Sequence, residues 1–212
     1  MEKLRGKFIT FEGGEGVGKS TQSKLLVEKL NKNGIEAVWT REPGGCEDAE
    51  EIRKLLISGS AGRWDGITEL LLMYATRRVH TEKKIKPSLK NNVTVVSDRY
   101  FDSSFAYQGF GHNLPIETIE TIRKIVLGDF KPDLTIFLDM DTEEALRRTD
   151  KRGDKNRFED MNLEFHRRVK EGFNYIVSKE KERFIRIDVA GLSVEVLNNM
   201  IIAKSAEFFS NQ

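Results

Sequence analysis

The sequence predicts an α/β protein in which five parallel strands form one sheet with helices on both faces. Short runs rich in β-branched or aromatic residues recur at wide intervals, at residues 7–12, 35–40, 93–97, 133–138 and 183–188. Helical patterns separate these runs, and parallel neighbours require such long connections. Ligands of these sheets bind beyond the carboxyl ends of the strands. We therefore expect the functional residues in the segments that follow the strands.

A glycine-rich segment follows the first run and has the spacing Gly-x-x-x-x-Gly-Lys-Ser. Its glycines let several N–H groups point at one anion, Lys19 can reach the outer phosphates, and the Ser20 hydroxyl can bind Mg²⁺. An amphipathic helix pattern follows and ends at Asn33-Gly34. These features predict a P-loop NTPase-type three-layer fold that binds the phosphates of a nucleoside triphosphate. The expected nucleotide-binding residues of the loop, for which the resemblance described below implies ATP, are Gly13, Gly14, Glu15, Gly16, Val17, Gly18, Lys19, Ser20 and Thr21.

Length and composition favour one domain spanning residues 1–212. The hydrophobic content of 38% allows a sizeable core, and the net charge of +1 gives no general attraction to nucleic acid or to a membrane. The single Cys46 cannot form an internal disulfide, and the N-terminus lacks the apolar stretch of a signal peptide, so we expect a cytoplasmic protein. The three histidines show no metal-ligand spacing and are interpreted as packing or surface residues.

Charged residues follow the second and third runs. Asp98 can hold Mg²⁺ or its waters, and Arg99 can clamp a phosphate through two parallel hydrogen bonds. An ion pair at a strand end would explain the same two residues. Arg41 and Glu42 open the turn Arg41-Glu42-Pro43-Gly44-Gly45, and turn geometry alone could account for it.

Residues 147–157 carry a strong local positive charge, with six basic residues against Asp150 and Asp154. Such a run is more often a solvated helix face than a site. Phosphoryl transfer, however, needs cations around the moving group, and the glycine-rich loop supplies only Lys19. We therefore interpret this segment as a lid that closes over the phosphates.

Two further positions have alternative interpretations. A carboxylate aimed at a triphosphate would be repelled, so Glu15 should face the second substrate, unless it simply faces solvent. Met73 and Arg77 lie four residues apart in the helical pattern of residues 68–80, so a flat base could rest on one and hydrogen-bond the other. Core packing with a charged helix end would produce the same pattern.

The chain resembles the thymidylate kinase family almost from end to end. The matching motifs occur in family order at residues 11–22, 40–45, 98–103, 106–109 and 128–135. The resemblance implies transfer of the γ-phosphoryl group of ATP to the 5′-phosphate of dTMP, with Mg²⁺ and as a homodimer. A deoxynucleoside kinase or another pyrimidine monophosphate kinase remains an alternative. A switch GTPase is disfavoured because no Asn-Lys-x-Asp sequence occurs.

The resemblance also implies residue roles. Arg99 would bind the acceptor phosphate, Arg77 would contact the thymine edge, and Tyr107 would crowd the sugar 2′ position, while Glu15 would approach the 3′-hydroxyl. The other implied substrate contacts are Glu42, Met73, Ser104 and Gln108. Lid arginines at Arg148, Arg152 and Arg157 match a bacterial subgroup with an acidic loop residue, and Lys19, Arg99, Arg152 and Glu15 form the implied catalytic set. Met73 replaces the phenylalanine usual in the family, which leaves open whether Met73 or Tyr74 covers the base and whether Arg77 or Arg78 reads it.

Overall fold

The computed structural model describes residues 1–60, 62–150 and 157–211. Its five strands pair in parallel, in the order β2-β3-β1-β4-β5. They are β1 Phe8–Glu12, β2 Ala37–Arg41, β3 Thr94–Asp98, β4 Leu134–Asp139 and β5 Phe184–Asp188. Each strand overlaps one of the five predicted runs, so the prediction of a parallel α/β sheet is confirmed.

Helices connect the strands. The longer ones are α1 Lys19–Lys32, α2 Glu47–Ile57, α3 Gly66–His80, α6 Ile116–Leu127, α7 Thr142–Asp150, α8 Leu163–Lys179 and α9 Val194–Ser210. The shorter ones are η1 Glu2–Leu4, η2 Thr81–Ile85, α4 Lys86–Lys90, α5 Asp102–Ser104, η3 Phe105–Gly111 and η4 Lys181–Arg183. Segments η2 and η3 have π-helical geometry, which is frequent near functional sites.

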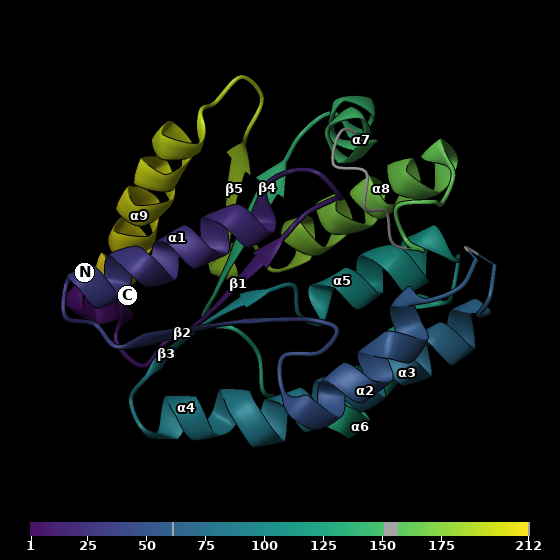
Figure 1. The fold of residues 1–212 in the computed structure, drawn as a ribbon, viewed down its shortest axis with the longest axis horizontal. Coiled ribbons are helices and arrows are strands. Elements are labelled where there is room, and N and C mark those ends of the chain that lie inside the picture. Colours follow the sequence, from purple (N-terminus) through teal and green to yellow (C-terminus); the bar gives the residue numbers. More distant parts are fainter. Residues whose placement is uncertain (61, 151–156, 212) are drawn as a thin grey trace.

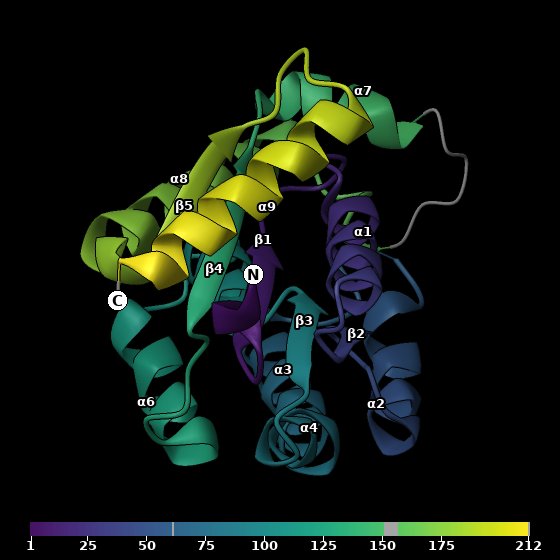
Figure 2. The same cartoon turned by 90° about the vertical axis from the view of Figure 1, so that its left-hand side faces the viewer.

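Helices cover both faces of the sheet, as Figures 1 and 2 show. On one face, α1 and α9 pack on alternate strand residues such as Ile9 and Leu134, which are paired in register. On the other face, α3, α6, η3 and α8 pack on Phe8 and Val95, which are also paired. Because successive strand residues point to opposite faces, both cores are built from the same five strands.

The topology gathers the segments that carry the predicted site. Strand β1 lies between β3 and β4, and β3 also pairs with β2. Asp98 is in register with Phe11 on one side and with Arg41 on the other. The segments that leave β1, β2 and β3 therefore meet at the carboxyl edge of the sheet.

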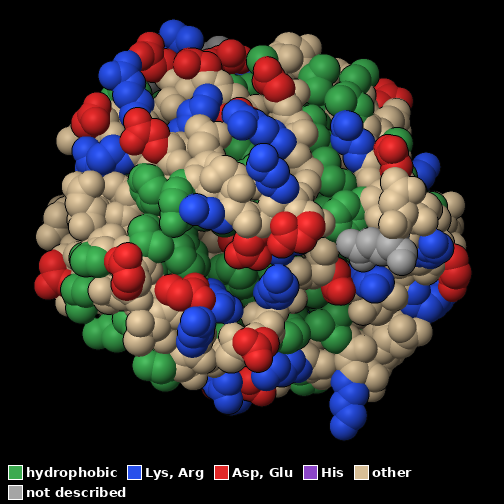
Figure 3. Space-filling model, turned by 180° about the vertical axis from the view of Figure 1, so that it is seen from behind, with side chains coloured by type: hydrophobic (Ala, Val, Ile, Leu, Met, Phe, Trp, Pro, Cys, Tyr) green, Lys and Arg blue, Asp and Glu red, His purple; other side chains and the backbone are tan. Residues whose placement is uncertain are grey.

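The surface mixes charges of both signs. Seen from behind, Lys and Arg side chains are interspersed with Asp and Glu (Figure 3), in keeping with the net charge of +1. Within the described ranges, the helices are too short or too polar for any to traverse a lipid bilayer.

Candidate active site

The glycine-rich loop joins the end of β1 to the start of α1, and its backbone turns tightly. Gly13 and Gly16 adopt positive φ values of 141° and 76°. A Cβ at Gly13 would collide with the Leu138 carbonyl, and one at Gly16 would collide with the Ala145 carbonyl. Glycine is therefore required at both positions. The loop ends at the N-terminus of α1, where free N–H groups and the helix dipole favour an anion.

Lys19 is folded back onto this loop. Its Nζ donates a hydrogen bond of 2.5 Å to the Gly14 carbonyl, and the residue is buried. Burial, together with the nearby Arg99 guanidinium, lowers the pKa of Lys19 to about 8. A bound phosphate would add its negative charge to that of the nearby Glu15 and Asp98 carboxylates, which would favour the protonated form of Lys19.

The predicted metal residues lie together. Ser20 Oγ donates to the Asp98 carboxylate, which joins the start of α1 to the end of β3. A hydroxyl and a carboxylate are hard oxygen ligands that suit Mg²⁺, and phosphate oxygens and waters usually complete its octahedron. The described residues form no cluster of three or more His, Cys, Asp or Glu side chains that could hold a metal. These two residues therefore fit Mg²⁺ arriving with a nucleotide rather than a cage of protein ligands.

Arg99 links the phosphate loop to η3. Its Nη1 donates to the Gly13 carbonyl and to Ser103 Oγ, both at 3.0 Å. Its Nη2 donates to Glu15 Oε1 at 2.8 Å and to the Tyr107 hydroxyl at 3.0 Å, and that hydroxyl donates to Glu15. Burial raises the pKa of Glu15, but Arg99 and Lys19 outweigh burial and hold it at about 2. Glu15 is thus an ionised partner of Arg99.

A cleft of about 820 Å³ opens beside these residues. It is lined by Arg41 of β2, which the sequence analysis left open between a functional residue and a turn residue, and by Arg53 of α2. Both arginines line the same cleft as Arg99. Burial and the nearby Arg41 guanidinium lower the pKa of Arg53. The sequence analysis missed Arg53, because a single basic residue on a helix is too common to signal a site. The predicted residues on the cleft wall are Glu15, Gly16, Gly18, Lys19, Ser20, Thr21, Glu42, Asp98, Arg99 and Arg148.

Apart from Met73, which is partly buried, the predicted base-contacting residues are buried next to the cleft. Arg77 Nε donates to Glu42 at 2.7 Å, Nη1 to Ser104 at 2.9 Å, and Nη2 to the Tyr100 carbonyl at 3.1 Å. Arg78, in contrast, is exposed and donates to the Val126 carbonyl. The structure therefore brings Arg77, and not Arg78, to this group.

The neighbours of Arg77 differ in burial. Tyr74 is buried in the core, and its ring lies 4.6 Å from the Arg77 guanidinium. Met73 is only partly buried, which favours Met73 over Tyr74 as the side chain that can cover a base. Tyr107 and Gln108 are also buried, and Phe158 packs edge-on against Tyr107 at 6.0 Å while lining the cleft.

The basic segment is only partly described. Arg148 lines the cleft and pairs with Glu144 at 2.9 Å. Arg152 lies outside the described residues. Arg157, which the resemblance grouped with the lid arginines, is instead buried, donates to the Leu56 carbonyl at 2.9 Å and pairs with Glu69.

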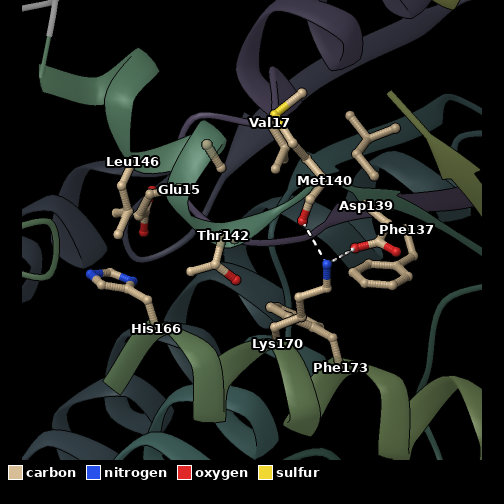
Figure 4. A pocket seen from close by; sticks show the side chains of 13 residues that line it. Glu15, Val17, Phe137, Asp139, Met140, Thr142, Leu146, His166, Lys170 and Phe173 are labelled. Atoms are coloured by element: carbon tan, nitrogen blue, oxygen red, sulfur yellow. Dashed lines mark hydrogen bonds and ion pairs between the residues drawn. The ribbon is translucent and has the colours of Figure 1, made fainter. Parts of the chain in front are cut away.

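A second, much smaller pocket of about 20 Å³ lies behind the loop (Figure 4). Lys170 of α8 donates to the Met140 carbonyl at 2.8 Å and lies 3.2 Å from Asp139. Figure 4 shows Glu15 and His166 at the opposite end. The space suits a single water molecule, so we assign this pocket a structural role in tying α8 to β4.

A buried carboxyl group, that of Glu12, is connected to Arg99 through Ser103. Glu12, at the end of β1, accepts a hydrogen bond of 2.7 Å from the Tyr100 amide and one of 2.6 Å from Ser103 Oγ. Burial and the nearby Asp102 carboxylate raise the pKa of Glu12 to about 8. Because this pKa lies above the ordinary 4.5, the folded state holds the proton more tightly than the unfolded state.

We expect the Glu12 contribution to stability to be complete below pH 4.5 and to be lost as the pH rises to about 8. Within that window the free energy of unfolding should fall by up to about 1.4 kcal/mol per pH unit. Urea unfolding of the wild type and of Glu12→Gln at pH 5, 6, 7 and 8 measures the difference. Equal slopes for the two proteins would contradict the assignment.

The fold and this site define a phosphate-loop nucleotide-binding protein in which a second group of arginines lines the same cleft. The family model described as Thymidylate kinase matches residues 11–201. The thymidylate kinase of Caulobacter vibrioides is 46% identical over 184 residues, covering 87% of this chain and 88% of that protein. That of Hahella chejuensis is 45% identical, with the same coverage. The crystal structure of thymidylate kinase from Ehrlichia chaffeensis superposes with a TM-score of 0.78 at 35% identity, covering 95% of this chain and 99% of that one. The chain belongs to the thymidylate kinase family.

Proposed function

We propose that this chain, acting as one nucleoside monophosphate kinase domain over residues 1–212, transfers the γ-phosphoryl group of ATP to dTMP. The products are dTDP and ADP, and the reaction supplies a precursor of dTTP. The observation that carries the proposal is a second group of cations, Arg41, Arg53 and Arg99, lining the same cleft as Lys19. One triphosphate does not need two separate cation groups, whereas a transfer between two phosphorylated substrates does.

The phosphate loop and the start of α1 hold ATP. Loop N–H groups surround the β-phosphate, and Lys19 leaves the Gly14 carbonyl to contact the outer phosphates. Ser20 and Asp98 would hold Mg²⁺, which neutralises charge on the transferred group when bound. Arg148, on the cleft wall, is placed to contact the nucleotide from the α7 side.

Arg99 positions the acceptor. Its guanidinium already binds an anion, the Glu15 carboxylate, at 2.8 Å. The 5′-phosphate of dTMP accepts hydrogen bonds from the Arg99 guanidinium in place of part of its contact with Glu15. Glu15 then accepts a hydrogen bond from the sugar 3′-hydroxyl. The thymine ring lies near Met73, Arg77, Ser104 and Gln108. The two substrates are thereby held with their phosphates facing each other, which is the main requirement of phosphoryl transfer.

A coupled ADP-release assay tests the proposed function. We expect turnover with dTMP that exceeds turnover with dUMP, UMP, CMP, AMP and GMP. The three arginines in the cleft predict little turnover with thymidine itself, which has no phosphate for them to bind. Preference for thymidine would identify a deoxynucleoside kinase, and preference for another monophosphate would refute the thymine assignment.

Tyr107 is expected to exclude ribonucleotides. Its ring packs against Phe158, Phe165 and Phe173, and its hydroxyl is tied to Arg99 and Glu15, so the ring has little freedom to yield to a 2′-hydroxyl. Tyr107→Ala should lower the ratio of kcat/KM for dTMP to that for ribo-TMP by about tenfold. Tyr107→Phe keeps the ring and should keep most of the ratio. A ratio that Ala leaves unaltered would remove this role.

We also propose that the chain forms a cytoplasmic homodimer. Cys46 is a free thiol, which suits a reducing compartment. Leu71 and Ile67 leave an apolar stripe on the outer face of α3, with exposed fractions of 54% and 43%. Apolar side chains that are exposed in a row favour a protein partner.

Leu71→Arg should therefore shift the protein from dimer to monomer at micromolar concentration, because it buries an unpaired charge in the interface. Light scattering coupled to gel filtration measures the mass. Val194→Arg is the matched control, since Val194 is equally exposed, at 55%, but lies on α9. A wild-type monomer would contradict the proposed homodimer, and a Leu71→Arg dimer would place the interface elsewhere.

A further inference from the structure

Two helical segments face each other, and in each of them side chains four residues apart lie on one face. On α3 the spacing selects Glu69, Met73 and Arg77. On the facing segment it selects Ser104 and Gln108, in α5 and η3. Arg77 binds Ser104 at 2.9 Å, and Gln108 Nε2 donates to Glu69 Oε1 at 2.7 Å. Along α3, Met73 therefore lies between Glu69, which accepts a hydrogen bond from Gln108, and Arg77, which donates one to Ser104.

Glu69 is fully buried, yet it is an ionised carboxylate. Its Oε2 pairs with the Arg157 guanidinium, and its Oε1 lies 3.2 Å from His112 Nε2. Burial raises the pKa of Glu69, but its contacts with His112 and Arg157 outweigh burial and lower it overall. At neutral pH this carboxylate carries no proton and can only accept hydrogen bonds.

This restriction fixes the orientation of the Gln108 amide. The amide has a donor end and an acceptor end, and only its NH₂ end can satisfy a carboxylate. The carbonyl end must then point away from Glu69. Gln108 Oε1 is indeed buried and has no hydrogen-bond partner within the described part of the chain. A buried acceptor without a partner costs free energy, and a ligand that donates a hydrogen bond to it removes that cost. Gln108 Oε1 is therefore suited to accept a hydrogen bond from the ligand.

We propose that Glu69 is a positioning residue which, through Gln108, selects a base that carries a hydrogen on N3. The inference rests on the proposed function and deepens it. Thymine and uracil have an N3–H that Gln108 Oε1 can accept, whereas cytosine has an acceptor at N3 that this oxygen repels. Were Glu69 uncharged and able to donate, the amide could turn over and present its NH₂ group to cytosine at little cost.

Glu69→Gln tests this role. The new amide donates as well as accepts, so Gln108 is no longer held in one orientation. The measurement is kcat/KM for dTMP and for 5-methyl-dCMP, which share the sugar, the phosphate and the 5-methyl group. Arg77 is unchanged in every variant, so its different effects on the two bases cancel when each variant's ratio is divided by the wild-type ratio. We expect the ratio of the two values to fall about tenfold relative to wild type, roughly the effect of one misdirected hydrogen bond.

Loss of the charge at Glu69 leaves Arg157 buried without its carboxylate, which will destabilise the fold. The double variant Glu69→Gln/Arg157→Gln removes both charges and gives a second protein with the same freed amide. Its ratio should fall equally. Asp102→Asn is the matched control, because Asp102 is a buried carboxylate on the facing segment α5 that is held by Arg183, at 2.9 and 2.6 Å, rather than by Glu69 or Gln108. It should lose stability but keep the wild-type ratio to within about twofold.

The outcomes separate the inference from the proposed function. If a folded Glu69→Gln or double variant loses activity on both bases in parallel, with the ratio unchanged, Glu69 is only structural and the inference is overturned. The inference is also overturned if Asp102→Asn lowers the ratio as much, since the effect would then be general. If the wild type does not phosphorylate dTMP, the proposed function itself is wrong.

Discussion

Lys19→Ala is expected to lower kcat about a thousandfold while ATP still binds. Lys19 is buried against the phosphate loop and is the residue that can follow the transferred group from donor to acceptor. The loop N–H groups and the dipole of α1 remain in the variant and still hold the β-phosphate. Single-turnover kinetics measure the chemical step, and a thermal shift with ATP measures binding.

Lys24→Ala is the matched control for this variant. Lys24 lies on the same helix and lines the same cleft, but it is exposed and its ammonium lies over the Trp39 ring at 4.7 Å. Its loss should change kcat by less than about threefold, since a solvated cation contributes little. Equal losses in the two variants would show that only the general positive charge matters. Full turnover by Lys19→Ala would contradict its role.

Arg99→Lys should reduce kcat/KM for dTMP by about a hundredfold or more, because the bidentate fork is replaced by a point charge. The substitution tests the guanidinium geometry alone, because lysine keeps the positive charge. Arg99 has a positive φ of 70°, and lysine bears the same backbone strain as arginine in that conformation. The backbone N–H of Arg99 donates a hydrogen bond of 2.9 Å to the Phe11 carbonyl, which helps to hold this strained conformation.

The effect of Arg99→Lys should fall mainly on dTMP. Initial rates at varied dTMP and fixed ATP, and then the reverse, separate the two substrates. Arg41→Lys is the matched control, because Arg41 lines the same cleft but is half-exposed and pairs with Glu50 at 3.3 Å. Arg41→Lys should lower kcat/KM for dTMP by less than about tenfold. If KM for ATP rises while KM for dTMP stays the same, Arg99 belongs to the donor site instead.

The strands and the phosphate loop were predictable because their causes are local. Buried strands need short apolar β-branched runs, and helix α1 ends at Lys32 with Asn33 as its cap, as the sequence indicated. Gly13 and Gly16 occupy positions that only glycine tolerates, so the motif itself specifies the loop. Asp98 and Arg99 were also found, because the end of a central parallel strand is a restricted place in any such sheet.

Other parts of the site depend on contacts that no local pattern encodes. Arg53 comes to the cleft because α2 packs beside α3, and nothing in its own segment marks it. Arg157 belongs to a basic run and was grouped with the lid, yet it is buried beside Glu69, 88 residues earlier in the chain. The choice between Arg77 and Arg78 also needed the structure, since a helix turns by about 100° per residue and neighbours point in different directions.

By itself, the sequence determined that the chain builds a parallel sheet and predicted a phosphate-binding loop at the end of its first strand, because periodicity and glycine spacing act over a few residues. The placement among nucleotide kinases came from the resemblance of its motifs to the thymidylate kinase family. Only the tertiary structure decided which cations share a cleft, that Glu15 pairs with Arg99, and that Gln108 donates a hydrogen bond to Glu69. Those facts arise from side chains distant along the chain. Their charges interact strongly because folding brings them together where water is excluded.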